Sequence, residues 1–202
     1  MIDIDIIYKI ILFWVIFYIT PGPVWVAVME ATRNLSNTEV LRFFTKVFLP
    51  VNATLQFAQA MICVVFVEWV SRIFADIGLW FYIFGGLYIL YLSYKVIRSK
   101  TKNTTLDLTV SNLVMIMALS PKIWLLFPSG AIIATQLEQS IMLNAFIFAS
   151  IMALVASLFF FLYAIIGKMG TKLLKDNFAY LSFFLLILFA LFLFNEAANL
   201  LQ

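Results

Sequence analysis

The first apolar segment of the chain is interrupted by the sequence Thr20-Pro21-Gly22-Pro23. Neither proline has a backbone N–H, and each ring clashes with the preceding helical turn. Gly22 permits backbone conformations that other residues avoid. A helix that reaches this sequence must therefore kink or break, and it leaves carbonyl groups without helical partners. Inside a bilayer such carbonyls are tolerated only where they face protein or a water-filled cavity.

A second interruption, Ser120-Pro121-Lys122, lies in an apolar segment of the other half of the chain. In both places a hydroxyl residue precedes a proline, and a tryptophan follows closely, at Trp25 and Trp124. Two proline-interrupted spans at corresponding positions in two halves are typical of a transporter with a site between inverted repeats. Two unrelated proline kinks, which are common in membrane helices, are the alternative.

The composition places the chain in a membrane. Of the 202 residues, 65% are hydrophobic and only 11% are charged, and the mean hydropathy is +1.08. Soluble domains have about 25% charged residues. We therefore expect one transmembrane domain over residues 1–202. The net charge of +3 does not indicate nucleic-acid binding, because the positive residues lie in short connections between apolar segments.

We expect an all-α fold with six transmembrane helices. About 20 apolar residues cross a bilayer as a helix. Segments of this kind cover, approximately, residues 4–29, 43–67, 77–96, 108–134, 141–166 and 178–200. The first and fourth helices are expected to break at their proline motifs.

Positive residues concentrate in alternate connections between these segments. They are Arg33, Arg42 and Lys46 in the first connection, Lys95, Arg98, Lys100 and Lys102 in the third, and Lys168, Lys172 and Lys175 in the fifth. Cytoplasmic loops carry the excess of lysine and arginine, so both termini are predicted to lie outside. Each half, residues 1–102 and 103–202, then has three spans, which predicts two inverted three-helix repeats.

Lys122 lies about halfway along the fourth predicted span. A lysine at mid-helix costs roughly 2.5–3.5 kcal/mol on insertion scales, so it needs a partner or water. One interpretation is that it binds the carboxylate of a zwitterionic substrate. The other is that it extends toward the cytoplasm or bonds the carbonyls that a helix break leaves free.

Asn52, Gln56 and Gln59 share one face of the second predicted helix. An amide stripe in an apolar helix faces other helices rather than lipid. It either lines a substrate path or forms interhelical hydrogen bonds, and the second is the interpretation that we favour. Glu30, at the end of the first span, is expected at the membrane interface.

Chemistry on the substrate is not indicated by the residue types present. The chain has no histidine and a single cysteine, Cys63, and no paired carboxylates lie at mid-membrane. We therefore expect no cofactor, no metal site and no enzymatic activity. The pair Gly85-Gly86 predicts a close helix contact in the third span.

Three short motifs, together with the chain length and the six-span layout, resemble the LysE/RhtB family of amino-acid exporters. The motifs are Thr20-Pro21-Gly22-Pro23, Gly86-Leu87-Tyr88-Ile89-Leu90-Tyr91-Leu92 and Ser120-Pro121-Lys122. The resemblance implies export of amino acids or similar small zwitterions across a bacterial cytoplasmic (inner) membrane, coupled to the ion gradient, and is compatible with a homodimer. Ser120 stands where the family usually has asparagine, so the chain would be a divergent member.

The sequence thus predicts a secondary transporter whose small-molecule substrate binds between the two breaks. The predicted substrate-binding residues are Thr20, Pro21, Gly22, Pro23, Asn52, Gln56, Ser120, Pro121 and Lys122. The alternative is a membrane assembly or partner-binding subunit that does not transport. A polar cavity between the first and fourth spans would favour the transporter.

Overall fold

The computed structural model describes residues 3–101, 106–174 and 177–200, and within these ranges the chain is helical and contains no strand. This confirms the predicted all-α class. Lys102 and Lys175, which contribute to the predicted orientation, lie outside the described residues. Four helical segments are long and apolar enough to cross a membrane, and there are six if each of two bent helix pairs is one span. The chain is therefore a multi-pass membrane protein.

The first half contains the first bent pair, a composite helix and one long helix. These are α1 (Ile4–Ile19) with α2 (Pro23–Thr32), the second span Asn37–Val65, and α6 (Val67–Thr101). The second half repeats this order. It consists of α7 (Val110–Ala118) with α8 (Pro121–Thr135), then α9 (Ile141–Leu174) and α10 (Asn177–Asn199).

The second span is continuous but changes its helical type twice. It consists of α3 (Asn37–Phe43), α4 (Leu49–Val51), α5 (Phe57–Val65) and two π-helical segments between them, Phe44–Phe48 and Asn52–Gln56. The π-helical segments flank Pro50, whose missing N–H interrupts the ordinary hydrogen-bond ladder. The span begins earlier than the predicted residue 43, because Ser36 and Glu39 form a capping box before it.

Two helices are longer than predicted. The predicted loop before residue 77 is helical, since α6 starts directly after the bend at Phe66, whose φ of −125° and ψ of 38° end α5. Helix α9 continues past the predicted end at residue 166 and includes Gly167. This glycine packs against the backbone of α2, where an added Cβ atom would lie 2.5 Å from the carbonyl oxygen of Met29.

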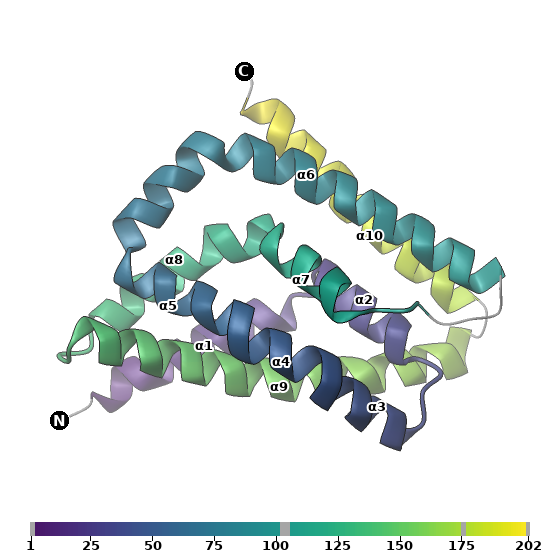
Figure 1. The fold of residues 1–202 in the computed structure, drawn as a ribbon, viewed down its shortest axis with the longest axis horizontal. Helices are drawn as coiled ribbons and strands as arrows, with labels where there is room; N and C mark the ends of the chain where they lie inside the picture. The colour runs from purple at the N-terminus through teal and green to yellow at the C-terminus, as the bar shows by residue number, and fades with distance from the viewer. Residues whose placement is uncertain (1–2, 102–105, 175–176, 201–202) are drawn as a thin grey trace.

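The two halves contact each other through corresponding elements. Helix α6 packs against α10 and α5 against α9, and the first bent pair contacts the second through α1 and α8. Each bent pair also contacts two straight spans, and the contacts correspond between the halves. Helix α2 packs against α9 and α10, and its counterpart α8 packs against α5 and α6. In Figure 1, α1 and α2 run from left to right, whereas α7 and α8 run from right to left. These are the contacts and directions expected of two inverted three-helix repeats.

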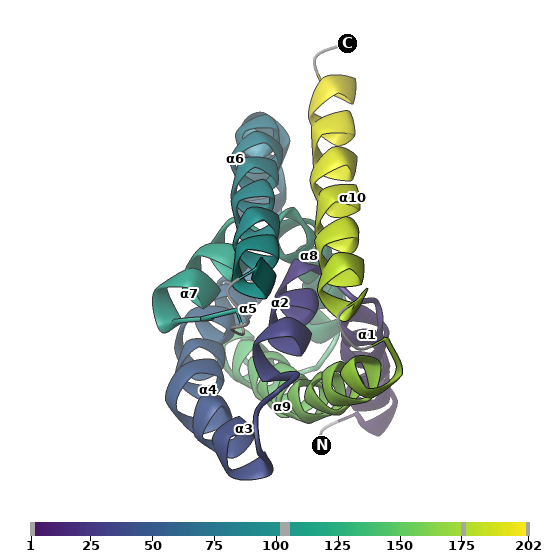
Figure 2. The same ribbon diagram turned by 90° about the vertical axis from the view of Figure 1, so that its right-hand side faces the viewer.

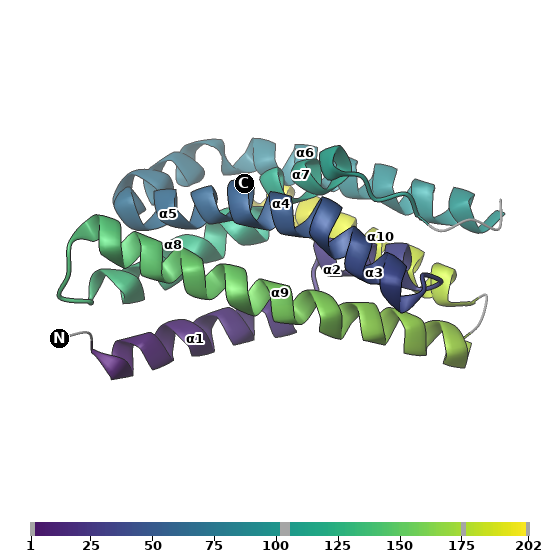
Figure 3. The same ribbon diagram turned by 60° about the horizontal axis from the view of Figure 1, so that its bottom comes forward.

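Helices α6 and α10 stand side by side and project from the rest of the bundle, as Figure 2 shows. Helices α1 and α9 lie together on the opposite side, with α9 running the length of the molecule in Figure 3. Between these two layers lie α2, α7 and α8, so the helices on the C-terminal side of both breaks lie between the layers. Gly85 of α6 confirms the predicted close contact, since a Cβ atom there would lie 2.6 Å from the carbonyl oxygen of Leu119.

The contact between α9 and α2 predicts a stability difference between two glycine substitutions. Gly167→Ala is expected to lower the free energy of unfolding by about 1–2 kcal/mol. Overpacking costs up to about 3 kcal/mol, and the better helix propensity of alanine recovers about 1 kcal/mol. Gly22→Ala is the control, because its Cβ atom would lie 3.8 Å from the nearest atom outside its chain neighbours. Thermal unfolding in detergent measures both, and equal stability of the two variants contradicts the prediction.

Candidate functional site

The two helix breaks have nearly the same geometry. Thr20 has φ −78° and ψ 107°, and Ser120 has φ −78° and ψ 109°. Each residue precedes a proline, which excludes the helical conformation and favours this extended one. The helices on either side meet at 64° in the first break and at 62° in the second. The agreement supports the interpretation that the two breaks are equivalent parts of a repeat rather than unrelated kinks.

Gly22 does not adopt a backbone conformation that is restricted to glycine, although its conformational freedom was expected to matter at the break. Its φ of −120° and ψ of −179° are extended values that any residue adopts. The absent side chain matters for space instead, since the nearest atom to an added Cβ atom is Cδ of Lys122, at 3.8 Å. Gly22 therefore leaves room beside the lysine at the point where the two breaks meet.

Every carbonyl at the end of α1 has a hydrogen-bond donor. The ammonium group of Lys122 donates to the carbonyl oxygens of Phe17 at 2.7 Å and Thr20 at 2.8 Å. The hydroxyl of Tyr163, in α9, is 3.1 Å from the carbonyl oxygens of both Tyr18 and Ile19. The Thr20 hydroxyl donates to the carbonyl of Ile16 at 3.0 Å. The last carbonyls of a helix have no helical partner, and here side chains from both repeats supply the missing donors.

Of the two interpretations of Lys122, this structure contains the one in which the lysine bonds freed carbonyls. Its ammonium group also lies 4.4 Å from the ring centroid of Phe17. A lysine has three N–H donors, and two of them point to carbonyl oxygens. One N–H of the ammonium group is left for a further acceptor.

Two cavities meet at Lys122. A small one, of about 20 Å³, lies between the first residues of α2 and α8 and is also lined by Tyr18 and Gln56. This is room for about one water molecule. A larger one, of about 260 Å³, extends from the same breaks toward α6 and α10. Both cavities are lined by Gly22, Pro23, Ser120 and Lys122.

Most predicted site residues line one or both cavities, but three do not. Pro121 lines the larger cavity and Gln56 the smaller one. Thr20 and Pro21 are exposed and line neither, although the carbonyl of Thr20 binds Lys122. Asn52 is fully buried and donates to the carbonyl of Ala153 in α9 at 3.1 Å. Its geometry is that of an interhelical hydrogen bond, the favoured interpretation of the amide stripe.

Gln56 differs from Asn52 because it faces the smaller cavity. It is 3% exposed, and neither its Oε1 atom nor the Tyr18 hydroxyl has a hydrogen bond of ordinary geometry among the described residues. The two side chains nevertheless lie within reach of each other. Unpaired buried polar atoms are costly, so this pair is the part of the site best placed to bond a ligand.

Three aromatic residues lie around the breaks in addition to the predicted substrate-binding residues, and only Tyr163 was not identified from the sequence. Tyr163 binds the end of α1, Trp25 stacks on its ring at 4.9 Å between centroids, and the indole of Trp124 donates to the carbonyl of Ala118 at 2.8 Å. Only the two tryptophans carried a signal, namely their positions just after the prolines. Tyr163 lies in an apolar run that resembles any other part of α9.

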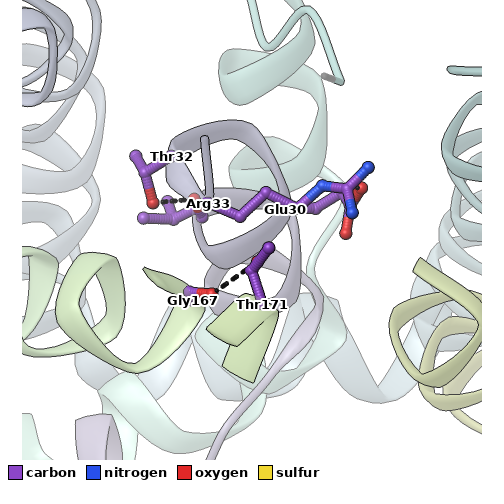
Figure 4. A network of polar contacts seen from close by, with 6 residues as sticks. Glu30, Thr32, Arg33, Gly167 and Thr171 are labelled. Atoms are coloured by element: carbon purple, nitrogen blue, oxygen red, sulfur yellow. Dashed lines mark hydrogen bonds and ion pairs between the residues drawn. The ribbon is translucent and has the colours of Figure 1, made fainter. Parts of the chain in front are cut away.

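Glu30 lies near the end of α2 and is buried within the protein, which its position in the sequence does not indicate. Its side chain is fully buried and pairs with Arg33, with 2.8 Å between Nε of Arg33 and Oε1 of Glu30. Figure 4 shows the two side chains leaving α2 in the same direction, while Thr32 points away from them and Gly167 and Thr171 of α9 lie alongside. The close approach of α9 at Gly167 helps to exclude solvent from the end of α2.

The described residues contain no group of three or more acidic, histidine or cysteine side chains that could hold a metal ion. No protein-family model, curated protein or solved structure matches the chain. Its function is therefore inferred from the geometry of the breaks and cavities.

The Tyr163 hydroxyl is expected to stabilise the fold. Tyr163→Phe leaves the carbonyls of Tyr18 and Ile19 without this donor, which should lower the free energy of unfolding by about 1–3 kcal/mol. Tyr94→Phe removes an exposed hydroxyl from α6 and is the control. Denaturation of both variants in detergent provides the comparison. A loss no larger for Tyr163→Phe than for Tyr94→Phe would show that the hydroxyl contributes nothing to stability.

Because Glu30 and Arg33 form an ion pair at the end of α2, the effects of substituting them on the free energy of unfolding are expected to be non-additive. Arg33→Met leaves Glu30 buried without its counter-charge, which should cost about 3–5 kcal/mol. Adding Glu30→Gln removes the charge, so the double variant should recover most of this loss. A double-mutant cycle by thermal unfolding measures the coupling. Simple addition of the two single effects would mean that the charges do not interact.

Proposed function

We propose that the protein is a secondary transporter that exports amino acids or similar small zwitterions by alternating access, as a divergent LysE/RhtB-like exporter of a bacterial cytoplasmic membrane. The observation that carries the proposal is the pair of matched helix breaks around shared cavities. Half-helix starts that face one site in the membrane interior are the usual anion-binding elements of such transporters. A homodimer and the predicted orientation, with both termini outside, belong to the same proposal.

The contact between Lys122 and α1 suggests how a zwitterion would bind. In the structure a positive group of one repeat is held by carbonyl oxygens of the other. An amino acid carries both kinds of group. Its ammonium would take the place of Lys122 at the carbonyls of Phe17 and Thr20, and its carboxylate would bind the released Lys122. The exchange conserves charge and leaves no buried ion without a partner. In a medium of low dielectric, an unpaired buried charge is strongly unfavourable.

Such an exchange also supports alternating access. The hydrogen bonds of Lys122 connect α8 of the second repeat to α1 of the first. A substrate that replaces these hydrogen bonds would break this direct connection between the repeats. Rocking of one repeat against the other would then open the site to the opposite side of the membrane.

The alternative, a membrane subunit that does not transport, is favoured by two observations. A cavity lies between the first and fourth spans, but its lining is mainly apolar, whereas the transporter hypothesis predicted a polar lining. The carbonyls at the end of α1 are also already satisfied by protein donors. A rigid structural protein needs no more than this arrangement.

Counterflow in proteoliposomes tests the proposal. Vesicles loaded with a mixture of amino acids are expected to take up labelled amino acid, and Lys122→Met should abolish uptake. Tyr163→Phe is the matched control, because it removes a donor from the same helix end but lines neither cavity. Its uptake per folded protein should stay within about twofold of the wild type, since the residue does not contact the substrate.

Chemical analogues test the exchange of charged groups. An amino-acid amide lacks the carboxylate for Lys122, and an N-acetylated amino acid lacks the ammonium for the α1 carbonyls. Both should compete poorly with the parent amino acid. Absence of uptake of every amino acid by correctly folded protein would favour the non-transporting subunit, and undiminished uptake by Lys122→Met would refute the role of the lysine.

A further inference from the structure

The larger cavity of about 260 Å³ has two chemically different ends. At the breaks it is lined by Ser120 and Lys122, next to the small cavity that contains Gln56. Away from the breaks it is bounded by α6, α7 and α10. The residues there include Ile89, Ile116, Phe189 and Leu193. A ligand that fills it would have its polar part at the breaks and an apolar part between α6 and α10.

No charged side chain lines the apolar end of the cavity among the described residues. Lys122 is the one charged side chain that lines the cavity among the residues the structure describes. The hydroxyl of Tyr88 is directed to the carbonyl of Asn112, at 3.2 Å, and so to α7. A charged ligand side chain placed here would face a lining without charged groups, which is unfavourable. A small polar side chain would leave most of the apolar space unfilled.

We propose that the cargo of this site is a zwitterion with a bulky apolar side chain, of the size of leucine, methionine or phenylalanine. The inference rests on the proposed transport function and adds its substrate class. The charged head binds at the breaks, between Lys122 and the end of α1, and the side chain enters the cavity between α6 and α10. The cavity thus selects the cargo, while the breaks bind what all amino acids share.

The selectivity for an apolar side chain has an expected magnitude. Each buried methylene contributes about 0.8 kcal/mol, which is about fourfold in affinity. Leucine should therefore exchange at least about tenfold faster than serine at equal concentrations below saturation. Lysine and glutamate should be weaker still. Counterflow of labelled leucine, with unlabelled phenylalanine, methionine, serine, lysine or glutamate as competitor, measures this order.

Substitutions in the cavity locate the side chain. Ile89→Phe narrows the cavity and should reduce leucine exchange at least about tenfold, whereas Ile83→Phe on the same helix does not line it and should have little effect. Phe189→Ala enlarges the cavity and should shift the preference from leucine toward phenylalanine. Phe184→Ala, at an exposed position of the same helix α10, is its control. The second pair keeps the test decisive if Ile89→Phe does not fold.

The outcomes separate this inference from the proposed function. Exchange of serine, lysine or glutamate without preference for leucine would leave transport standing and overturn the inference. The inference is also overturned if leucine is preferred but Ile89→Phe and Phe189→Ala change this preference no more than their control variants do. A lipid acyl chain would then be the better occupant of the cavity. If no amino acid exchanges at all, the proposed function fails and the inference fails with it.

Discussion

The hydrogen bonds between Lys122 and the end of α1 are the interaction on which the arrangement of the two repeats depends. A helix that stops inside a membrane exposes carbonyl groups, and no water replaces their partners. A lysine inside a membrane has the opposite need, since its ammonium requires acceptors. Each feature alone is unfavourable, and together they satisfy one another at 2.7 and 2.8 Å. The break of one repeat therefore stabilises the break of the other.

The surrounding packing keeps this pair in place. Helix α9 supplies Tyr163 to the same helix end and approaches α2 closely at Gly167. Helix α6 approaches the second break just as closely at Gly85. One long helix of each half thus packs against the bent pair of the other half, α9 against α2 and α6 against α8.

The sequence predicts what local chemistry decides. Two prolines near Thr20 and one after Ser120 are enough to predict both breaks, and runs of apolar residues are enough to predict six spans. What tertiary packing decides could not be predicted in this way. Glu30 looks interfacial by position but is buried within the protein and paired with Arg33, and α9 continues past Gly167, which packs against the backbone of α2. The partner of Lys122 lies in the other repeat, where no local pattern indicates it.

The apolar character of the larger cavity changes how selectivity should be understood in this protein. If the head of a zwitterion replaces Lys122 at the α1 carbonyls and then binds Lys122 itself, the new hydrogen bonds resemble the ones that they replace. Such an exchange contributes little net affinity, and it contributes the same amount for every amino acid. Discrimination must therefore come from the part of the site that has no polar group to exchange. In this chain that part is the space between α6, α7 and α10, lined by residues such as Ile89, Ile116 and Leu193, where only the area of apolar surface buried distinguishes one cargo from another.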